Sequence, residues 1–159
     1  SPVPHHIILT GYVLGGVARG LLVGLIVTIL SLFFTHLSLH HLLVIIYSVF
    51  LTATLFSIGG FINAVFAKSF DDISIVPTFI LTPLTYLGGV FYSIQNLSPF
   101  FQNVSLFNPI VYMVNTFRYG ILGVSDVNVG LSLTMMTALT IGLYFYALRL
   151  LSSGRGMKE

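Results

Sequence analysis

Long apolar stretches alternate with short polar breaks along this 159-residue chain. A helix needs about 20 consecutive apolar residues to cross the hydrocarbon core of a bilayer. Stretches of that length cover residues of about 8–35, 42–67, 73–92 and 130–151. The pattern therefore predicts four membrane-spanning helices. We expect an all-α, polytopic transmembrane helical bundle that forms a single domain over residues 1–159.

The segment between the third and fourth spans is more polar, yet still rich in Phe, Tyr and Ile. Two helix-start signals, Ser98-Pro99 and Asn108-Pro109, each join a capping side chain to a proline at the first helical position. The helices that they predict, about 99–107 and 109–122, are too short to cross a bilayer. We expect a re-entrant or interfacial helical hairpin over about 98–123. It should pack against the spans, because irregular backbone at that depth needs protein or water around it.

Small residues recur regularly in the first span. Gly16, Gly20 and Gly24 are four residues apart, so they lie on one helix face where a second backbone can approach closely. Such stripes drive helix association in many membrane proteins. We therefore expect these glycines to serve helix packing.

The third span carries hydroxyl side chains on one helical face. Steps of four and three residues align Thr78, Thr82, Thr85, Gly89 and Tyr92. Such a face suits a translocation cavity, and it equally suits hydroxyls that bond back to carbonyls of their own helix. Both interpretations stay open at this point. Pro77 and Pro83 each remove a backbone donor and bend this helix, which frees carbonyls that need partners inside the bundle.

The composition supports a membrane protein and argues against other classes. Hydrophobic residues make up 56% of the chain and charged residues 6%, against about 25% charged in an average soluble domain. So few charges cannot coat a water-facing surface. The six Lys and Arg residues are scattered singly, without the basic run that follows a phosphate backbone. We therefore expect no nucleic-acid partner.

The positions of the positive charges predict an orientation. If the chain begins on the cytoplasmic side, the cations on that side are Lys68, Arg149, Arg155 and Lys158. This arrangement obeys the positive-inside rule, so we expect both ends of the chain in the cytoplasm. Arg19 lies in the interior of the first span. We expect it to face protein or the inner headgroup zone, because a lipid-facing charge is costly.

The sequence offers little catalytic chemistry. His36, His40 and His41 have a spacing found in some zinc sites but no carboxylate or thiol near them in sequence, so interfacial histidines in a turn are the better interpretation. Asp71 and Asp72 suit capping at the start of the third span. The sequence has no cysteine and no Walker A pattern. We expect no catalytic residue, metal or cofactor here, and any ATP hydrolysis on another chain.

Two runs of residues carry a family resemblance. They are FAKSFDDISIVPTFILTPLTYLGGVFYS over residues 66–93 and LFNPIVYMVNTFRYG over residues 106–120. Both closely resemble the membrane subunit of type-2 ATP-binding-cassette exporters. The most specific part is the stretch that holds Asn108, Pro109 and Arg118, because hydrophobicity alone does not dictate that combination. The resemblance extends over essentially the whole chain.

The resemblance implies a six-span permease, of which this chain would hold the third to sixth spans, with the N-terminal part lacking. Ser1, Pro2 and Pro4 would then end the cytoplasmic connection that docks on the ATPase. Re-entrant helices before the last span are a family feature. A permease dimer with two ATPase subunits is implied, in which the partner binds ATP and Mg²⁺. The span over residues 73–92 would line the central path, with Thr78, Thr82, Thr85 and Tyr92 facing it.

The function expected is the membrane-spanning subunit of an ATP-driven exporter in the bacterial inner membrane. An alternative is an ion- or proton-coupled carrier or a channel that uses Arg19 and the hydroxyl face. The lack of Asp and Glu in the middle of the spans weakens it, since proton relays need intramembrane carboxylates or histidines. An intramembrane enzyme that uses the histidines is a third hypothesis.

Overall fold

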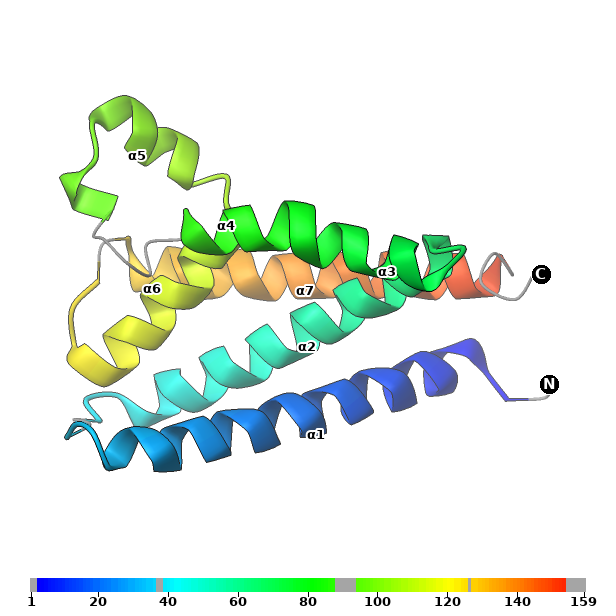
Figure 1. Ribbon diagram of the computed structural model, residues 1–159, viewed down its shortest axis with the longest axis horizontal. Helices are drawn as coiled ribbons and strands as arrows, with labels where there is room; N and C mark the ends of the chain where they lie inside the picture. The colour runs from blue at the N-terminus through cyan, green and yellow to red at the C-terminus, as the bar shows by residue number, and fades with distance from the viewer. Residues whose placement is uncertain (1–2, 37–38, 88–93, 126, 154–159) are drawn as a thin grey trace.

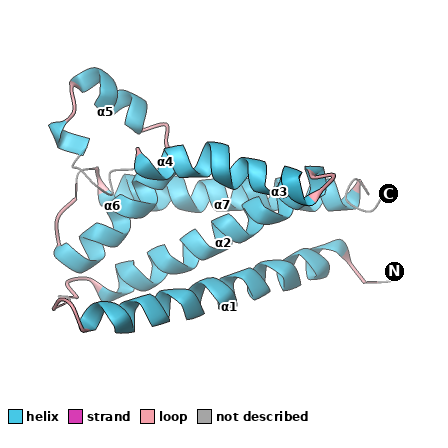
Figure 2. Cartoon of the chain, in the orientation of Figure 1, coloured by secondary structure: helices cyan, strands magenta, loops and turns pink. Residues whose placement is uncertain are grey.

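The computed structural model describes residues 3–36, 39–87, 94–125 and 127–153, and within these residues it contains helices and no strand. Figure 2 shows helices joined by short loops. The all-α fold class predicted from the apolar stretches is confirmed.

Three long helices form the body of the molecule: α1 (His5–Leu32), α2 (Leu42–Phe66) and α7 (Val129–Ser152). Among the described residues, these are the helices long and apolar enough to cross a membrane. They occupy the first, second and fourth predicted spans. In Figure 1, α2 lies between α1 and α7 and packs against both.

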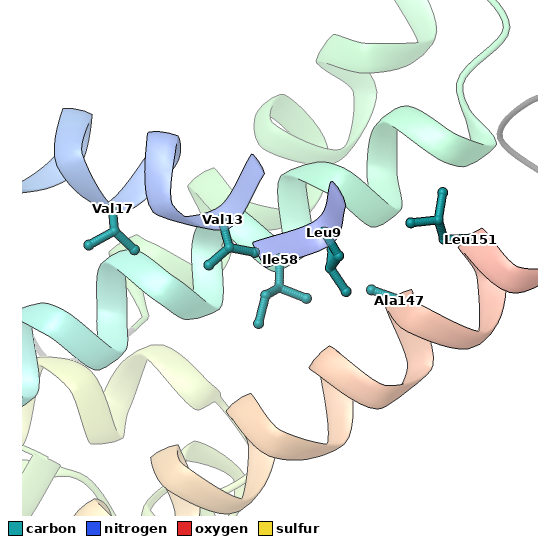
Figure 3. Close-up of a cluster of buried hydrophobic side chains, with 6 residues drawn as sticks. All are labelled: Leu9, Val13, Val17, Ile58, Ala147 and Leu151. Atoms are coloured by element: carbon teal, nitrogen blue, oxygen red, sulfur yellow. The ribbon is translucent and has the colours of Figure 1, made fainter. Parts of the chain in front are cut away.

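One hydrophobic cluster holds the three long helices together near the start of α1. Its side chains point toward one another in Figure 3 and come from α1, α2 and α7: Leu9, Val13, Val17, Ile58, Ala147 and Leu151. Beside it, the hydroxyls of Thr10 and Tyr144 are hydrogen-bonded at 2.8 Å. The start of α1 and the end of α7 therefore lie at the same end of the bundle.

The short helices at the other end differ in how they pack. α6 (Pro109–Leu122) packs between α2 and α7, and its buried Ile110, Tyr112 and Met113 join a second hydrophobic cluster with Leu51, Leu55 and Met136. α5 (Pro99–Ser105) stands away from the long helices and packs mainly against η2 (Ile94–Asn96), a short 3₁₀ turn. Of the two predicted hairpin helices, α6 therefore packs into the bundle, because it has a longer apolar face to bury, whereas α5 has only seven residues.

The third predicted span, 73–92, is described only as far as Leu87. Its helix comprises α3 (Phe70–Val76), the π-helical turn η1 (Pro77–Leu81) and α4 (Thr82–Tyr86). At the end of η1 the Thr82 N–H bonds to the Pro77 carbonyl, which lies five residues earlier. In a regular α-helix the acceptor lies four residues earlier. A proline lacks the N–H and crowds the preceding turn, which is the usual cause of such a local change in winding.

The carbonyl that Pro77 leaves without its helical donor has a partner from another helix. In a regular helix the N–H of residue 77 would bond to the carbonyl of Ile73. The side-chain amide of Asn63, on α2, donates to that carbonyl at 2.8 Å instead. This bond ties the start of the third span to the last turns of α2.

We expect Asn63→Ala to lower the free energy of unfolding of the purified protein by about 0.5–1.5 kcal/mol, the net contribution of one hydrogen bond. In a Pro77→Ala background the restored N–H can serve the Ile73 carbonyl, so the same substitution should cost less. A double-mutant cycle on unfolding in detergent measures this coupling. Equal costs in the two backgrounds would contradict the account.

The first two glycines of the α1 stripe lie against α2. A Cβ added at Gly16 would stand 2.8 Å from the Ser57 Cβ and overlap the Ser57 hydroxyl, which itself donates to the Val13 carbonyl at 3.2 Å. A Cβ at Gly20 would approach that of Ala53 to 3.2 Å, whereas one at Gly24 would meet nothing within 4 Å. The close approach of α1 to α2 is therefore concentrated at Gly16 and Gly20.

Gly16→Ala should therefore destabilise the fold by about 1–3 kcal/mol through overpacking. Gly24→Ala is the matched control. It should be neutral or stabilising by up to about 1 kcal/mol, because alanine is the better helix former and the space is open. Midpoints of thermal unfolding in one detergent test the difference, and a larger loss at Gly24 would refute this packing.

Candidate functional site

A cavity of about 970 Å³ lies between α1, α2 and α6. Small-molecule sites in proteins commonly occupy about 300–1,000 Å³ and are lined mostly by apolar side chains with few polar groups. This cavity has that character, and it is larger than a second pocket of about 240 Å³ that residues of α2, α6 and α7 line. We therefore take it as the candidate site.

Each wall of the cavity is one face of a helix, because the residues that line it recur at intervals of three and four. The α1 wall consists of Gly16, Arg19, Gly20 and Val23. The α2 wall consists of Ser48, Val49, Thr52, Ala53, Phe56 and Ser57. The α6 wall consists of Ile110, Met113, Val114, Phe117, Arg118, Ile121 and Leu122, and Thr85 of α4 completes the lining. The glycines at 16 and 20 let the α1 wall approach the α2 wall closely at Ser57 and Ala53.

Two guanidinium groups give the cavity its electrostatic character. Arg19 comes from α1 and Arg118 from α6, and the lining contains no Asp or Glu. A charge at the middle of a membrane-spanning helix costs about 3 kcal/mol on insertion scales when it faces lipid. Arg19 is exposed in the single chain and lines the cavity together with Thr52 and Ser57. The site is thus apolar in its walls and positive at two points.

Asn108 fixes the N-terminal end of α6. Its Oδ1 accepts a hydrogen bond from the Ile110 N–H at 3.0 Å and so caps the helix, as the Asn-Pro signal predicts. Its Nδ2 donates to the Leu84 carbonyl at 2.8 Å, near the end of α4. One buried amide therefore joins the end of the third span to the start of the helix that forms a cavity wall.

The C-terminal end of α6 is held by the connection between α1 and α2. The Gly120 carbonyl accepts the N–H groups of His40 at 3.1 Å and His41 at 2.9 Å. The His40 Nδ1 lies 2.6 Å from the Ile121 carbonyl, and the His41 ring stacks on that of Tyr119 with centroids 4.6 Å apart. The helix then ends at Gly123, whose φ of 77° suits glycine.

These contacts account for two of the histidines without a metal. No group of three or more His, Cys, Asp or Glu side chains close enough to hold a metal ion occurs among the described residues.

The acidic pair at the third span lies in the first turn of α3. Ser69 caps α3 by accepting from the Asp72 N–H, while the Asp72 carboxylate accepts from the Lys68 N–H at 3.0 Å.

Asn115 is a residue whose role the sequence analysis did not foresee. It lies 5% exposed on α6. Its amide donates to the Val127 carbonyl and to the Ser132 hydroxyl, and its carbonyl accepts from the Val127 N–H. These bonds fix the connection that leads into α7. A polar side chain on the most apolar face of a short helix is the signal that could have revealed it, because a buried amide must be hydrogen-bonded.

The structure brings some of the predicted site residues together and separates others. Arg118, Thr85, Gly16 and Gly20 line the cavity, whereas Thr78, Thr82 and Gly24 do not. The hydroxyls of Thr82 and Thr85 donate to carbonyls of their own helix, at Pro77 and Leu81. Pro4 precedes α1 at its cap position and Pro109 is the first residue of α6. Tyr92, Gly89, Ser1 and Pro2 lie outside the described residues.

Comparison with known proteins decides the family. The family model described as ABC-2 type transporter matches residues 1–122 of the chain. The chain belongs to this family. The matched region includes all three walls of the cavity, and the resemblance drawn from residues 66–93 and 106–120 is confirmed.

Curated relatives of this ABC-2 family member are named as transport proteins. The chain is 52% identical over all 159 residues to the inner membrane transport permease YadH of Escherichia coli strain K12, and it shows the same identity to the YadH permease of Shigella flexneri. In each case the match covers 100% of this chain and 62% of the relative, so the chain spans about three fifths of the length of these permeases. Nodulation protein J of Rhizobium leguminosarum bv. viciae is 25% identical over 99 residues, which cover 60% of this chain and 38% of the relative. No solved structure matches significantly.

In this ABC-2 family member, Asn108→Ser should keep the helix cap but lose the bond to Leu84, and Asn108→Ala should lose both. A cap contributes about 1 kcal/mol, and an unsatisfied buried carbonyl costs about 1–3 kcal/mol. We expect the unfolding temperature to fall in the order wild type, Ser, Ala. Asn103→Ala, at an exposed position of α5, is the control and should change little. Equal effects of Ser and Ala would show that the bond to Leu84 carries the whole contribution, and no effect of Ser would assign it to the cap instead.

Proposed function

We propose that this chain is the membrane-spanning part of an ATP-driven exporter and that it provides the translocation pathway. The observation that carries the proposal is the family match over residues 1–122, together with the cavity that the matched helices enclose. Membership of a transporter family and the three apolar helices support a multi-pass membrane subunit. We propose in addition that transport is outward, that ATP drives it and that a separate ATPase is the partner.

We further propose that ATP and Mg²⁺ bind to a separate ATPase subunit that docks at the end of the bundle where α1 begins and α7 ends. No Walker A pattern occurs in the 159 residues. Lys68, between α2 and α3, and Arg149, in the last turn of α7, lie toward this end. The positive-inside rule makes it the cytoplasmic end, which Ser1, Pro2 and Pro4 would join to the ATPase. The membrane would be the bacterial inner membrane, as in the names of the YadH relatives.

A second copy of the permease would complete the pathway along the third span. Described side chains of this span are largely exposed in the single chain, including Thr78, Phe79 and Thr82. The hydroxyl of Thr82, although it donates to its own helix, keeps lone pairs that can accept hydrogen bonds. Such a face, with Tyr92 beyond it in sequence, suits a polar path between two permeases better than a lipid-facing surface.

A carrier driven by a proton or ion gradient has less support. Such a carrier needs titratable or ion-binding groups within the membrane. Among the residues that line the cavity there is no carboxylate and no histidine. We therefore retain the ATP-driven subunit as the single proposal.

The test is purification of the full-length permease from its native membrane, followed by reconstitution in liposomes. An ATPase should copurify with it, and export of a reporter substrate should require ATP and be abolished in an ATPase whose Walker lysine is replaced. The permease alone should hydrolyse no ATP. Transport by liposomes that contain only the permease, driven by an imposed proton or sodium gradient, would contradict the proposal.

A further inference from the structure

Arg19 lies where a charged group needs a partner. The residues that line the cavity around it include no Asp or Glu. Arg19 is the fifteenth of the 28 residues of α1, which places it near the middle of the helix. The same face carries Gly16 and Gly20, which pack closely against Ser57 and Ala53 of α2, and the exposed Arg19 side chain lines the cavity beside them. Intramembrane arginines usually pair with another group or mark a ligand path.

The rest of the cavity is suited to hydrocarbon. The walls around Arg19 present mainly apolar side chains, among them Val23, Phe56, Val114 and Phe117. A small hydrated anion would lose its water here and gain few hydrogen bonds, while leaving these apolar walls uncovered. A molecule with one anionic group and long apolar chains satisfies both parts of the cavity at once.

The guanidinium group also restricts the chemistry of the anionic part. Its planar fork of donors forms paired hydrogen bonds with the oxygens of a phosphate or a carboxylate. Arg118 places a second guanidinium on the α6 wall of the same cavity. Phospholipids that carry net negative charge have the phosphate, the charge and the acyl chains that this lining matches.

We propose that the cavity between α1, α2 and α6 is a binding site for an anionic phospholipid, with Arg19 binding the phosphate and the apolar walls holding an acyl chain. This site goes beyond the proposed transport function, because it is defined by equilibrium binding and needs neither ATP nor a partner ATPase. The lipid bridges the faces of α1 and α6 across the cavity and neutralises the charge of Arg19.

The chain contains no tryptophan, which allows a fluorescent reporter to be placed in the cavity. Phe56→Trp puts an indole in the α2 wall at a position where the ring is already 38% exposed. The full-length protein with this substitution, and with any tryptophan outside this chain replaced by phenylalanine, would be reconstituted with lipids brominated on their acyl chains. Bromine quenches tryptophan only at contact, so quenching reports occupancy of the cavity by lipid.

Brominated phosphatidylglycerol should bind about tenfold more tightly than brominated phosphatidylcholine, because both carry the phosphate but only phosphatidylcholine carries a choline cation that neutralises it and is repelled by Arg19. Arg19→Gln should bring the ratio close to one. Arg19→Lys keeps the charge but loses the paired geometry, so it should retain a severalfold preference. Arg149→Gln, an arginine of α7 that does not line the cavity, is the matched control and should keep the full ratio.

Three results would overturn the proposal. Equal quenching by the two lipids in the parent protein would show that the cavity does not select charge. No quenching by either lipid would show that protein, such as a second copy of the chain, covers the cavity. A preference lost equally in Arg149→Gln, or kept in full in Arg19→Gln, would remove Arg19 as the binding group. Because the binding is measured without ATPase or nucleotide, these outcomes are independent of whether the protein proves to be an ATP-driven exporter.

Discussion

Inside a bilayer no water is available to main-chain N–H and C=O groups, so every break in a helix must find its hydrogen-bond partners within the protein. In this structure asparagine side chains supply many of them. Asn63 donates to the carbonyl that Pro77 leaves free, Asn108 joins the end of α4 to the start of α6, and Asn115 holds the connection into α7. An amide can donate and accept at the same time, which is why this residue type occurs at each break.

Because these asparagine side chains satisfy the hydrogen bonds of the backbone, a helix too short to span the membrane can lie within the bundle. α6 buries Ile110, Tyr112 and Met113 against α2 and α7 and turns its other residues toward α1. A full-length helix in its place would fill the space beside α1. The cavity therefore exists because α6 is short, inclined and fixed at both ends.

The elements of the fold could be predicted from the sequence where local chemistry determines them. Apolar length gave the three long helices, and the Asn108-Pro109 pair gave the start of α6, because the cap and the proline act within one turn. The cavity could not be predicted, since Arg19 and Arg118 are 99 positions apart in the numbering and meet only through packing. The bond from Asn63 to Ile73 likewise depends on how α2 and the third span are placed. The sequence signal at Ser98 was misleading in detail, because α5 begins there without a side-chain cap bond and remains outside the bundle.

The two attachments of α6 have a mechanical consequence. At one end Asn108 fastens it to α4, and at the other the Gly120 carbonyl holds the backbone of His40 and His41. A short helix that is hydrogen-bonded at both ends passes a displacement of one end on to the other. Any tilt of the third span must therefore also move the loop that joins α1 to α2, because α6 connects the two.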